Sequence, residues 1–230
     1  MVDIKENIAK IQACIIEAAR VSSRRPEDIK LMAVSKTRSV EEMSAAADFV
    51  DLFGENRIQE ACLKRDKWDS DNDVPWHYIG RLQRNKARKA LEIFDSIESV
   101  DSLDLARMLD RILVENGRTD YPVLLEINMS GEISKSGVEP SEAEHLLERI
   151  LTYCPNLAVN GLMTIGPLTR DEMRIRTAFA GLRQLRERMR NTFELPLEEL
   201  SMGMSGDFVL AIEEGSTIVR IGTAIFGSRV

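Results

Sequence analysis

The chain has 230 residues and a formal net charge of −7, with 31 lysines and arginines against 38 aspartates and glutamates. This acidic balance argues against nucleic acid or an anionic membrane surface as the main partner. Hydrophobic residues make up 43% of the chain and charged residues 30%, a balance typical of a folded globular protein and too apolar for general disorder. At this length we expect one domain that covers residues 1–230.

Cysteine usage and hydropathy indicate a cytoplasmic location. The three cysteines, Cys14, Cys62 and Cys154, are too widely spaced for a disulfide framework or for metal-ligand pairs. We therefore expect a reducing compartment and no metal site. No segment approaches the roughly 18 consecutive apolar residues of a membrane span, and charges interrupt the N-terminal segment where a signal peptide would be apolar.

Helical and strand patterns alternate along the chain. An amphipathic helix is predicted over residues 3–21, where apolar residues recur three or four positions apart. Pro26 blocks its continuation, and the apolar run 29–34 predicts a strand buried on both faces that ends at Lys36. Further strands are predicted over residues 50–54, 76–80, 96–100, 122–128, 158–164, 200–203 and 216–221. Helices are predicted over residues 40–47, 56–67, 83–92, 103–116, 141–154, 171–190 and 207–213.

This order predicts an α/β fold, a single (β/α)8 TIM barrel with an extra N-terminal helix. Eight strands, nearly all followed by a helix after a short connection, are typical of a parallel sheet closed on itself. We expect the N-terminal helix to close the bottom of the barrel and the last helix to be short or missing. A doubly wound open sheet alternates in the same way, but its usual G-x-G-x-x-G turn after the first strand is missing here.

Two loops carry residues suited to phosphate binding. In such barrels, phosphate usually binds at the loops after strands seven and eight. The first of these loops contains Ser205 and Gly206, whose small side chains let backbone amides approach an anion. The second supplies Arg220, Gly222 and Thr223. A common helix cap and an ordinary strand end are the alternative interpretations of these two loops.

Lys36 ends the first predicted strand, where its amine would enter the mouth of the barrel. Desolvation and nearby cations favour a neutral amine, which is the form that condenses with an aldehyde. A lysine whose stem packs on apolar surface while its amine reaches water is the alternative. Together with a phosphate site across the same mouth, Lys36 predicts an aldehyde-phosphate ligand, of which pyridoxal 5'-phosphate (PLP) is the common example.

Seven motifs in register then resemble the YggS/PROSC family of pyridoxal phosphate homeostasis proteins. They cover nearly the whole chain, and such an ordered set is far more specific than any one of them. The motifs are AVSKTRS (33–39), FGENRIQE (53–60), WHYIGRLQRNK (76–86), INMSGEISKSG (127–137), GLMTIG (161–166), LSMGMSGD (200–207) and TIVRIGTAIFG (217–227).

The resemblance implies a barrel similar to the N-terminal domain of bacterial alanine racemase, with PLP held as an imine on Lys36. It implies that Arg220 lies near the phosphate or the ring nitrogen, where an arginine weakens the ring as an electron sink and suits holding more than using the cofactor. It also implies roles in binding the phosphate or lining the cofactor for Asn56, Met163, Met204, Ser205, Gly222 and Thr223.

Two functions follow from this resemblance. The first is a PLP-binding protein of intracellular PLP (vitamin B6) homeostasis, a monomer without catalytic residues whose partners are PLP and apo PLP-dependent enzymes. The alternative is a PLP-dependent amino-acid racemase, which needs a second acid or base opposite Lys36. Alanine racemases supply it from an added domain, which we do not expect after Val230. The other candidates are His77, Tyr78, Tyr121, His145 and Tyr153.

Two further segments carry basic residues. Residues 81–89, RLQRNKARK, could suggest a nucleic-acid patch, but they lack interleaved aromatic residues and are more typical of a solvated helix face. Lys135 and Ser136 follow the fifth strand and suggest a second anion site at the rim.

Overall fold

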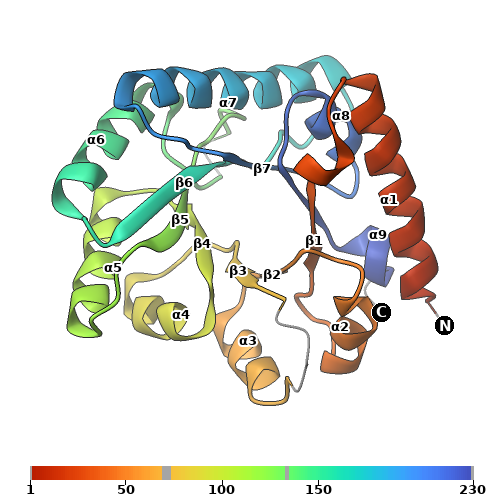
Figure 1. Cartoon of the computed structure of the whole chain (residues 1–230), viewed down its shortest axis with the longest axis horizontal. Helices are drawn as coiled ribbons and strands as arrows, with labels where there is room; N and C mark the ends of the chain where they lie inside the picture. The colour runs from red at the N-terminus through yellow and green to blue at the C-terminus, as the bar shows by residue number, and fades with distance from the viewer. Residues whose placement is uncertain (1, 69–73, 133–134, 229–230) are drawn as a thin grey trace.

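The computed structural model describes residues 2–68, 74–132 and 135–228. Within them, eight parallel strands form a closed barrel in the order β1-β2-β3-β4-β5-β6-β7-β8, and β8 pairs with β1 to complete the ring. Helices surround this barrel on its outer side (Figure 1). The predicted (β/α)8 barrel is therefore confirmed.

The strands are short and mostly buried along their whole length, as expected for a parallel sheet covered on both faces. They are β1 (Lys30–Val34), β2 (Leu52–Glu55), β3 (Trp76–Tyr78), β4 (Ser96–Val100), β5 (Tyr121–Glu126), β6 (Leu157–Met163), β7 (Glu199–Met204) and β8 (Ile218–Ile221). The helices are α1 (Ile4–Val21), α2 (Val40–Ala47), α3 (Ile58–Arg65), α4 (Ala87–Ile93), α5 (Leu103–Glu115), α6 (Ala143–Tyr153), α7 (Glu172–Phe193), α8 (Phe208–Glu213) and α9 (Thr223–Phe226).

Local sequence signals explain where several helices begin. The Ser39 side chain accepts a hydrogen bond from the Glu42 amide while the Glu42 side chain accepts one from the Ser39 amide, so a capping box starts α2. Asp171 caps α7 in the same position, with its side chain accepting from two amides of the first turn. Both caps fix the exit of a loop that leaves the carboxyl end of a strand.

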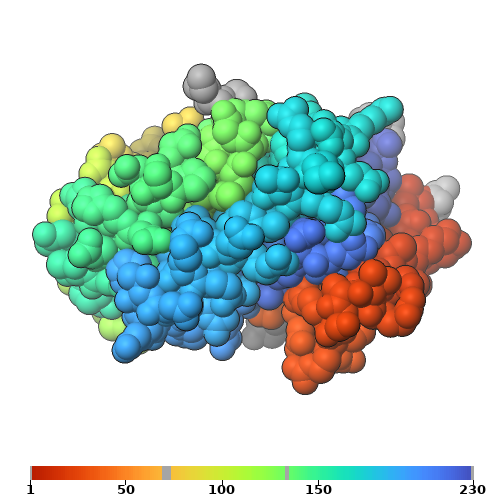
Figure 2. Space-filling model, turned by 90° about the horizontal axis from the view of Figure 1, so that it is seen from above, coloured from red at the N-terminus to blue at the C-terminus, as the bar shows by residue number. Residues whose placement is uncertain are grey.

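Helix α1 does not close the bottom of the barrel. It packs against α8, α9 and α2 in the outer layer, and Asn7 Nδ2 donates to the Ile225 carbonyl at 2.9 Å. Helices α8 and α9 have only 6 and 4 residues, so α1 covers a stretch of barrel wall that full-length helices would otherwise cover. Figure 1 shows α1 beside both, and Figure 2 shows α1 and α7 on one outer face.

The first strand ends two residues earlier than predicted. Strand β1 stops at Val34, and Ser35 and Lys36 enter a turn that the Arg38 amide closes on the Ser35 carbonyl at 3.0 Å. Thr37 takes a positive φ of 64° in this turn, a conformation that strand pairing does not allow. Lys36 therefore belongs to a loop at the mouth of the barrel.

Two other expectations from composition can be compared with the structure. Cys14, Cys62 and Cys154 are all free, which confirms that they form no disulfide. Among the helices of the described residues, none is long and apolar enough to cross a membrane.

Candidate functional site: a cavity at the mouth of the barrel

A cavity of about 260 Å³ opens at the carboxyl ends of β1, β7 and β8. Parallel strands bring their carboxyl ends to the same side of a barrel, so residues far apart in the sequence meet there. Six of the eight predicted site residues line it: Lys36, Met204, Ser205, Arg220, Gly222 and Thr223. Lys36 and the two small-residue loops after β7 and β8 thus line one cavity.

The β7 and β8 loops contact each other across the cavity. Ser205 Oγ accepts a hydrogen bond from the Ala224 amide at 3.3 Å, which links the loop after β7 to the start of α9. Asp207 folds the first loop back on itself, because its Oδ1 accepts from the Met204 amide at 2.6 Å. At Gly206 an added Cβ would meet no atom within 4 Å, so the space beside this backbone is open. The two loops therefore form a backbone-lined concavity with a hydroxyl on each side, suited to an anion.

Arg220 occupies the interior side of the cavity, with only 4% of its surface exposed. Its guanidinium donates from Nη1 to the carbonyl and hydroxyl of Ser201, at 2.6 and 2.8 Å, and from Nη2 to the Thr164 carbonyl at 2.7 Å. Burial lowers the pKa of Arg220, and the negative charges of Glu98 and Glu126 oppose that shift. Arg220 is thus a rigidly held cation anchored to β6 and β7.

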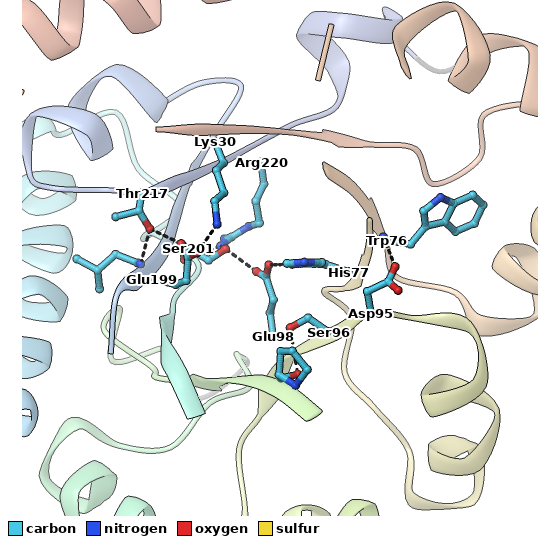
Figure 3. Close-up of polar contacts among 12 residues, drawn as sticks. Lys30, Trp76, His77, Asp95, Ser96, Glu98, Glu199, Ser201, Thr217 and Arg220 are labelled. Carbon is cyan, nitrogen blue, oxygen red and sulfur yellow. Dashed lines mark hydrogen bonds and ion pairs between the residues drawn. The ribbon is translucent and has the colours of Figure 1, made fainter. Parts of the chain in front are cut away.

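A chain of polar contacts continues from Arg220 across the inside of the barrel (Figure 3). The Ser201 hydroxyl donates to Glu98 Oε2, and the other oxygen of Glu98 bonds His77 Nδ1 at 2.7 Å. Burial by itself raises the pKa of Glu98, but His77, Arg220 and Ser201 lower it on balance. The carboxylate is therefore held as an anion in the barrel interior.

Sequence reasoning missed Glu98 and Ser201. The available signal was the glutamate in the middle of SIESV, a strand otherwise suited to full burial, because a charge there requires a partner. Sequence reasoning also missed Val34 and Ile79 as lining residues of the cavity, whereas Gly206, which lines it too, was already part of the predicted anion-binding loop. Each of these three lies at or just after the carboxyl end of a strand.

Asn56 and Met163 are absent from the residues that line the cavity. Asn56 follows β2, and its side-chain Oδ1 is buried without a hydrogen-bond partner among the described residues. Met163 is 1% exposed at the end of β6, beside Ser201 in the sheet. The contacts with a cofactor predicted for these two residues stay predictions.

The candidates for a second acid or base make contacts within the protein. The Tyr78 hydroxyl donates to the carbonyls of Asn56 and Arg81 at 3.4 and 3.3 Å, and burial raises the pKa of Tyr78 to about 12. The Tyr121 hydroxyl donates to the Phe94 carbonyl at 2.7 Å in the core. His77 bonds Glu98, whereas His145 and Tyr153 lie on α6 with exposed side chains.

Side chains of both basic segments outside the cavity form hydrogen bonds or ion pairs with other groups of the protein. Lys135 Nζ donates to the Gly166 carbonyl at 2.7 Å and pairs with Glu132 at 3.0 Å, and Ser136 Oγ donates to Glu126 at 2.6 Å. In the other segment, exposed ion pairs join Arg84 to Asp104, Arg88 to Glu115 and Lys89 to Glu92. Such pairs fit a solvated helix face.

Comparison with known proteins places this chain in a family. The alanine racemase N-terminal domain family matches residues 4–230. A pyridoxal phosphate homeostasis protein of Pseudomonas aeruginosa is 43% identical over 100% of this chain and 97% of its own length. The structure of PipY from Synechococcus elongatus with PLP bound is 39% identical, covers 93% of this chain and 100% of its own, and superposes with a TM-score of 0.80.

A more distant structure shares only the fold. An alanine racemase of Clostridium difficile superposes with a TM-score of 0.75 at 14% identity, over 97% of this chain and 57% of the racemase chain. At that identity, the likeness shows that both have the same barrel and says nothing about a shared reaction.

Proposed function

Because the chain belongs to the family of pyridoxal phosphate homeostasis proteins, we propose that it binds PLP in the cavity at the ends of β1, β7 and β8. In this role it takes part in intracellular PLP (vitamin B6) homeostasis. One observation carries the proposal: Lys36 and the Ser205 and Thr223 loops line the same cavity of about 260 Å³. A relative of 39% identity binds this cofactor, which supports the choice of ligand.

The residues around the cavity fit the cofactor. PLP brings an aldehyde and an electron-withdrawing ring. With PLP bound, the Lys36 amine would be the group that condenses with this aldehyde, and the aldehyde oxygen would leave as water with both amine protons. The Ser205 hydroxyl and the amides of Gly222 and Thr223 hold the phosphate, and the Met204 amide joins them only by giving up its hydrogen bond to Asp207 Oδ1. The open space at Gly206 leaves room for the phosphate.

Arg220 faces the ring nitrogen in this proposal. A guanidinium keeps its proton in proteins, so it disfavours a second cation at that nitrogen. The hydrogen bonds from Arg220 to Ser201 and Thr164 hold the guanidinium in place before any ligand arrives. The ring then draws electrons less strongly, a property that suits holding the cofactor more than using it. Asn56 and Met163 border the bound ring in the same proposal.

We propose a carrier rather than a racemase. The contacts of Tyr78 and His77 within the protein favour this choice, since a group that takes a proton from a substrate must reach the cavity. Residues 1–230 act as one cofactor-binding domain, as a cytoplasmic monomer that supplies PLP to apo PLP-dependent enzymes. The free cysteines are compatible with that compartment.

The absorption spectrum of the purified protein tests the attachment. With PLP, the wild type is expected to show the visible band of the conjugated imine, and Lys36→Ala is expected to lose it. Lys89→Ala, which removes an exposed lysine on α4 paired with Glu92, is the matched control and should keep the band. An unchanged band in Lys36→Ala would overturn the proposed attachment.

A second assay separates the carrier from the racemase. The protein with bound PLP is incubated with single L-amino acids, and D-enantiomer and keto acid are measured against Lys36→Ala. The carrier gives no product above that control. D-enantiomer that depends on Lys36 would establish the racemase instead, and keto acid that depends on Lys36 would indicate another PLP-dependent reaction.

A further inference from the structure

A buried ionic cluster lies directly behind the loop that carries Lys36. Lys64 on α3 has a side chain only 7% exposed, and its Nζ lies 2.6 Å from Glu55 Oε1 and 2.6 Å from Glu60 Oε1. The Glu55 side chain is fully buried. One cation and two carboxylates therefore meet between β2 and α3.

This cluster contacts the backbone on both sides of Lys36. Lys64 Nζ donates to the Ser35 carbonyl at 2.7 Å, and the Ser35 hydroxyl donates to Glu55 Oε1 at 2.8 Å. On the other side, the Thr37 amide donates to Glu60 Oε1. The residues before and after Lys36 are thus fixed to the same three charged side chains.

The loop needs such support because of its conformation. Thr37 has a φ of 64°, which costs a β-branched residue roughly 1–2 kcal/mol and persists only where the surroundings enforce it. The hydrogen bond from the Thr37 amide to Glu60 fixes that peptide, and Lys64 in turn holds Glu60. Through these contacts, Lys64 on α3 helps to fix the backbone on both sides of Lys36, and so the direction of the Lys36 side chain.

The cluster also carries an electrostatic cost. Burial raises the pKa of Glu55, while the charge and hydrogen bond of Lys64 oppose this shift. Glu55 Oε2 is buried without a hydrogen-bond partner among the described residues. Buried ion groups of this kind are often no more stabilising than apolar side chains of similar size, so stability alone is a weak reason for three of them.

We propose that Lys64 is a positioning residue for Lys36, which holds the Ser35–Thr37 turn so that the Lys36 amine meets the aldehyde of the cofactor. Lys64 itself is not among the residues that line the cavity. This inference rests on the proposed function. It separates the binding of the phosphate, which the β7 and β8 loops carry, from the formation of the C=N bond, which depends on the turn after β1.

The experiment compares two ligands that differ only at the reacting carbon. PLP has the aldehyde, whereas pyridoxine 5'-phosphate has an alcohol in its place and cannot form the bond. Lys64→Met keeps an unbranched stem and removes the three donors. We expect the rate of imine formation with PLP to fall about 10- to 100-fold, the range in which a small misplacement slows a reaction. Binding of pyridoxine 5'-phosphate should change less than about 2-fold, because the β7 and β8 loops, and not the turn after β1, carry the binding of the phosphate.

Lys67→Met, at an exposed position just after α3, is the matched control and should behave as the wild type. Equal rates of imine formation in Lys64→Met and wild type would overturn the inference, as would an equal loss with both ligands. If the wild type binds pyridoxine 5'-phosphate but forms no imine with PLP, the proposed attachment itself fails, which is a different result.

Two further variants separate positioning from folding. Lys64→Met with Glu55→Gln removes the buried carboxylate that Lys64→Met leaves unpaired, and the side-chain amide oxygen that replaces it can still accept from Ser35. We expect this double variant to recover stability in urea unfolding while imine formation stays slow, and recovery of the wild-type rate would overturn the inference. Should both variants fail to fold, Glu60→Ala decides, because it removes the acceptor that joins Lys64 to the Thr37 amide. Slower imine formation with unchanged pyridoxine 5'-phosphate binding then supports the proposal, and a wild-type rate contradicts it.

Discussion

Arg220 and Glu98, on opposite sides of the barrel, share the hydroxyl of Ser201. Arg220 Nη1 donates to this oxygen at 2.8 Å, and the hydroxyl donates in turn to Glu98 Oε2. The cation that faces the cavity is thereby matched by an anion in the barrel interior (Figure 3). Only 4% of Arg220 and 0% of Glu98 is accessible. If one of the two charges is removed, water therefore cannot solvate the charge that remains.

Removal of Glu98 should therefore destabilise the fold strongly. Glu98→Ala leaves Arg220 as a buried cation without the anion that shares the Ser201 hydroxyl with it, and we expect a loss of about 3–5 kcal/mol in the free energy of unfolding. Arg220→Met should cost a similar amount, and the double variant less than the sum of the two. Urea unfolding without ligand measures all three, and additivity within about 0.5 kcal/mol would contradict the coupling.

Two glycines of the β7 segment should respond in opposite ways to alanine. At Gly203, φ is +96° and an added Cβ would lie 2.6 Å from Ala211 Cβ, so Gly203→Ala should lose more than about 1 kcal/mol of stability. At Gly206, an added Cβ would meet no atom within 4 Å, so Gly206→Ala should stay within about 0.5 kcal/mol of wild type. If phosphate binds beside Gly206, Gly206→Ala should weaken the binding of pyridoxine 5'-phosphate while stability stays unchanged. Calorimetry measures this binding. Unchanged binding would remove Gly206 from the proposed phosphate site.

The stability contributed by Glu126 should decline as pH rises. Burial raises the pKa of Glu126, and the hydrogen bond from Ser136 opposes this shift. The folded state therefore holds the proton more tightly than the unfolded state. The resulting stability is fully present below the unfolded pKa and is lost as pH rises through the folded pKa.

Glu126→Gln removes this titration. Its free energy of unfolding relative to wild type should therefore increase as pH is raised from about 4, near the ordinary pKa of a glutamate. Urea unfolding of both proteins across this pH series tests the sign. A difference that falls with pH would contradict it.

Tyr78→Phe tests the racemase alternative, because it removes only the hydroxyl group that could act as an acid or base. Its hydroxyl makes two long hydrogen bonds, so Tyr78→Phe should cost no more than about 1 kcal/mol of stability and leave the imine band with PLP unchanged. Tyr121→Phe removes a shorter hydrogen bond in the core and serves as a control for stability alone. Any D-amino acid formation that Tyr78→Phe abolishes would identify this tyrosine as an acid or base.

Periodicity alone predicted the barrel, since short buried runs alternate with helical patterns and each such pattern is local in the chain. The meeting of Lys36 with the loops after β7 and β8 was also predictable. Once eight parallel strands close into a ring, their carboxyl ends must share one mouth, whatever the details of packing. Six of the nine residues that line the cavity were therefore among the eight site residues predicted from the sequence, Met204 only through the family resemblance.

Only the tertiary structure decided how those residues are held. Strand β1 ends at Val34 because Lys64 and Glu60, from a helix more than twenty positions further along, capture the turn after it. The partner of Arg220 is a serine on β7, and that serine's own partner is Glu98 on β4. Helix α1 lies in the outer layer because α8 and α9 are short. These relationships depend on distances between elements after the barrel has closed, and no local pattern in the chain encodes such distances.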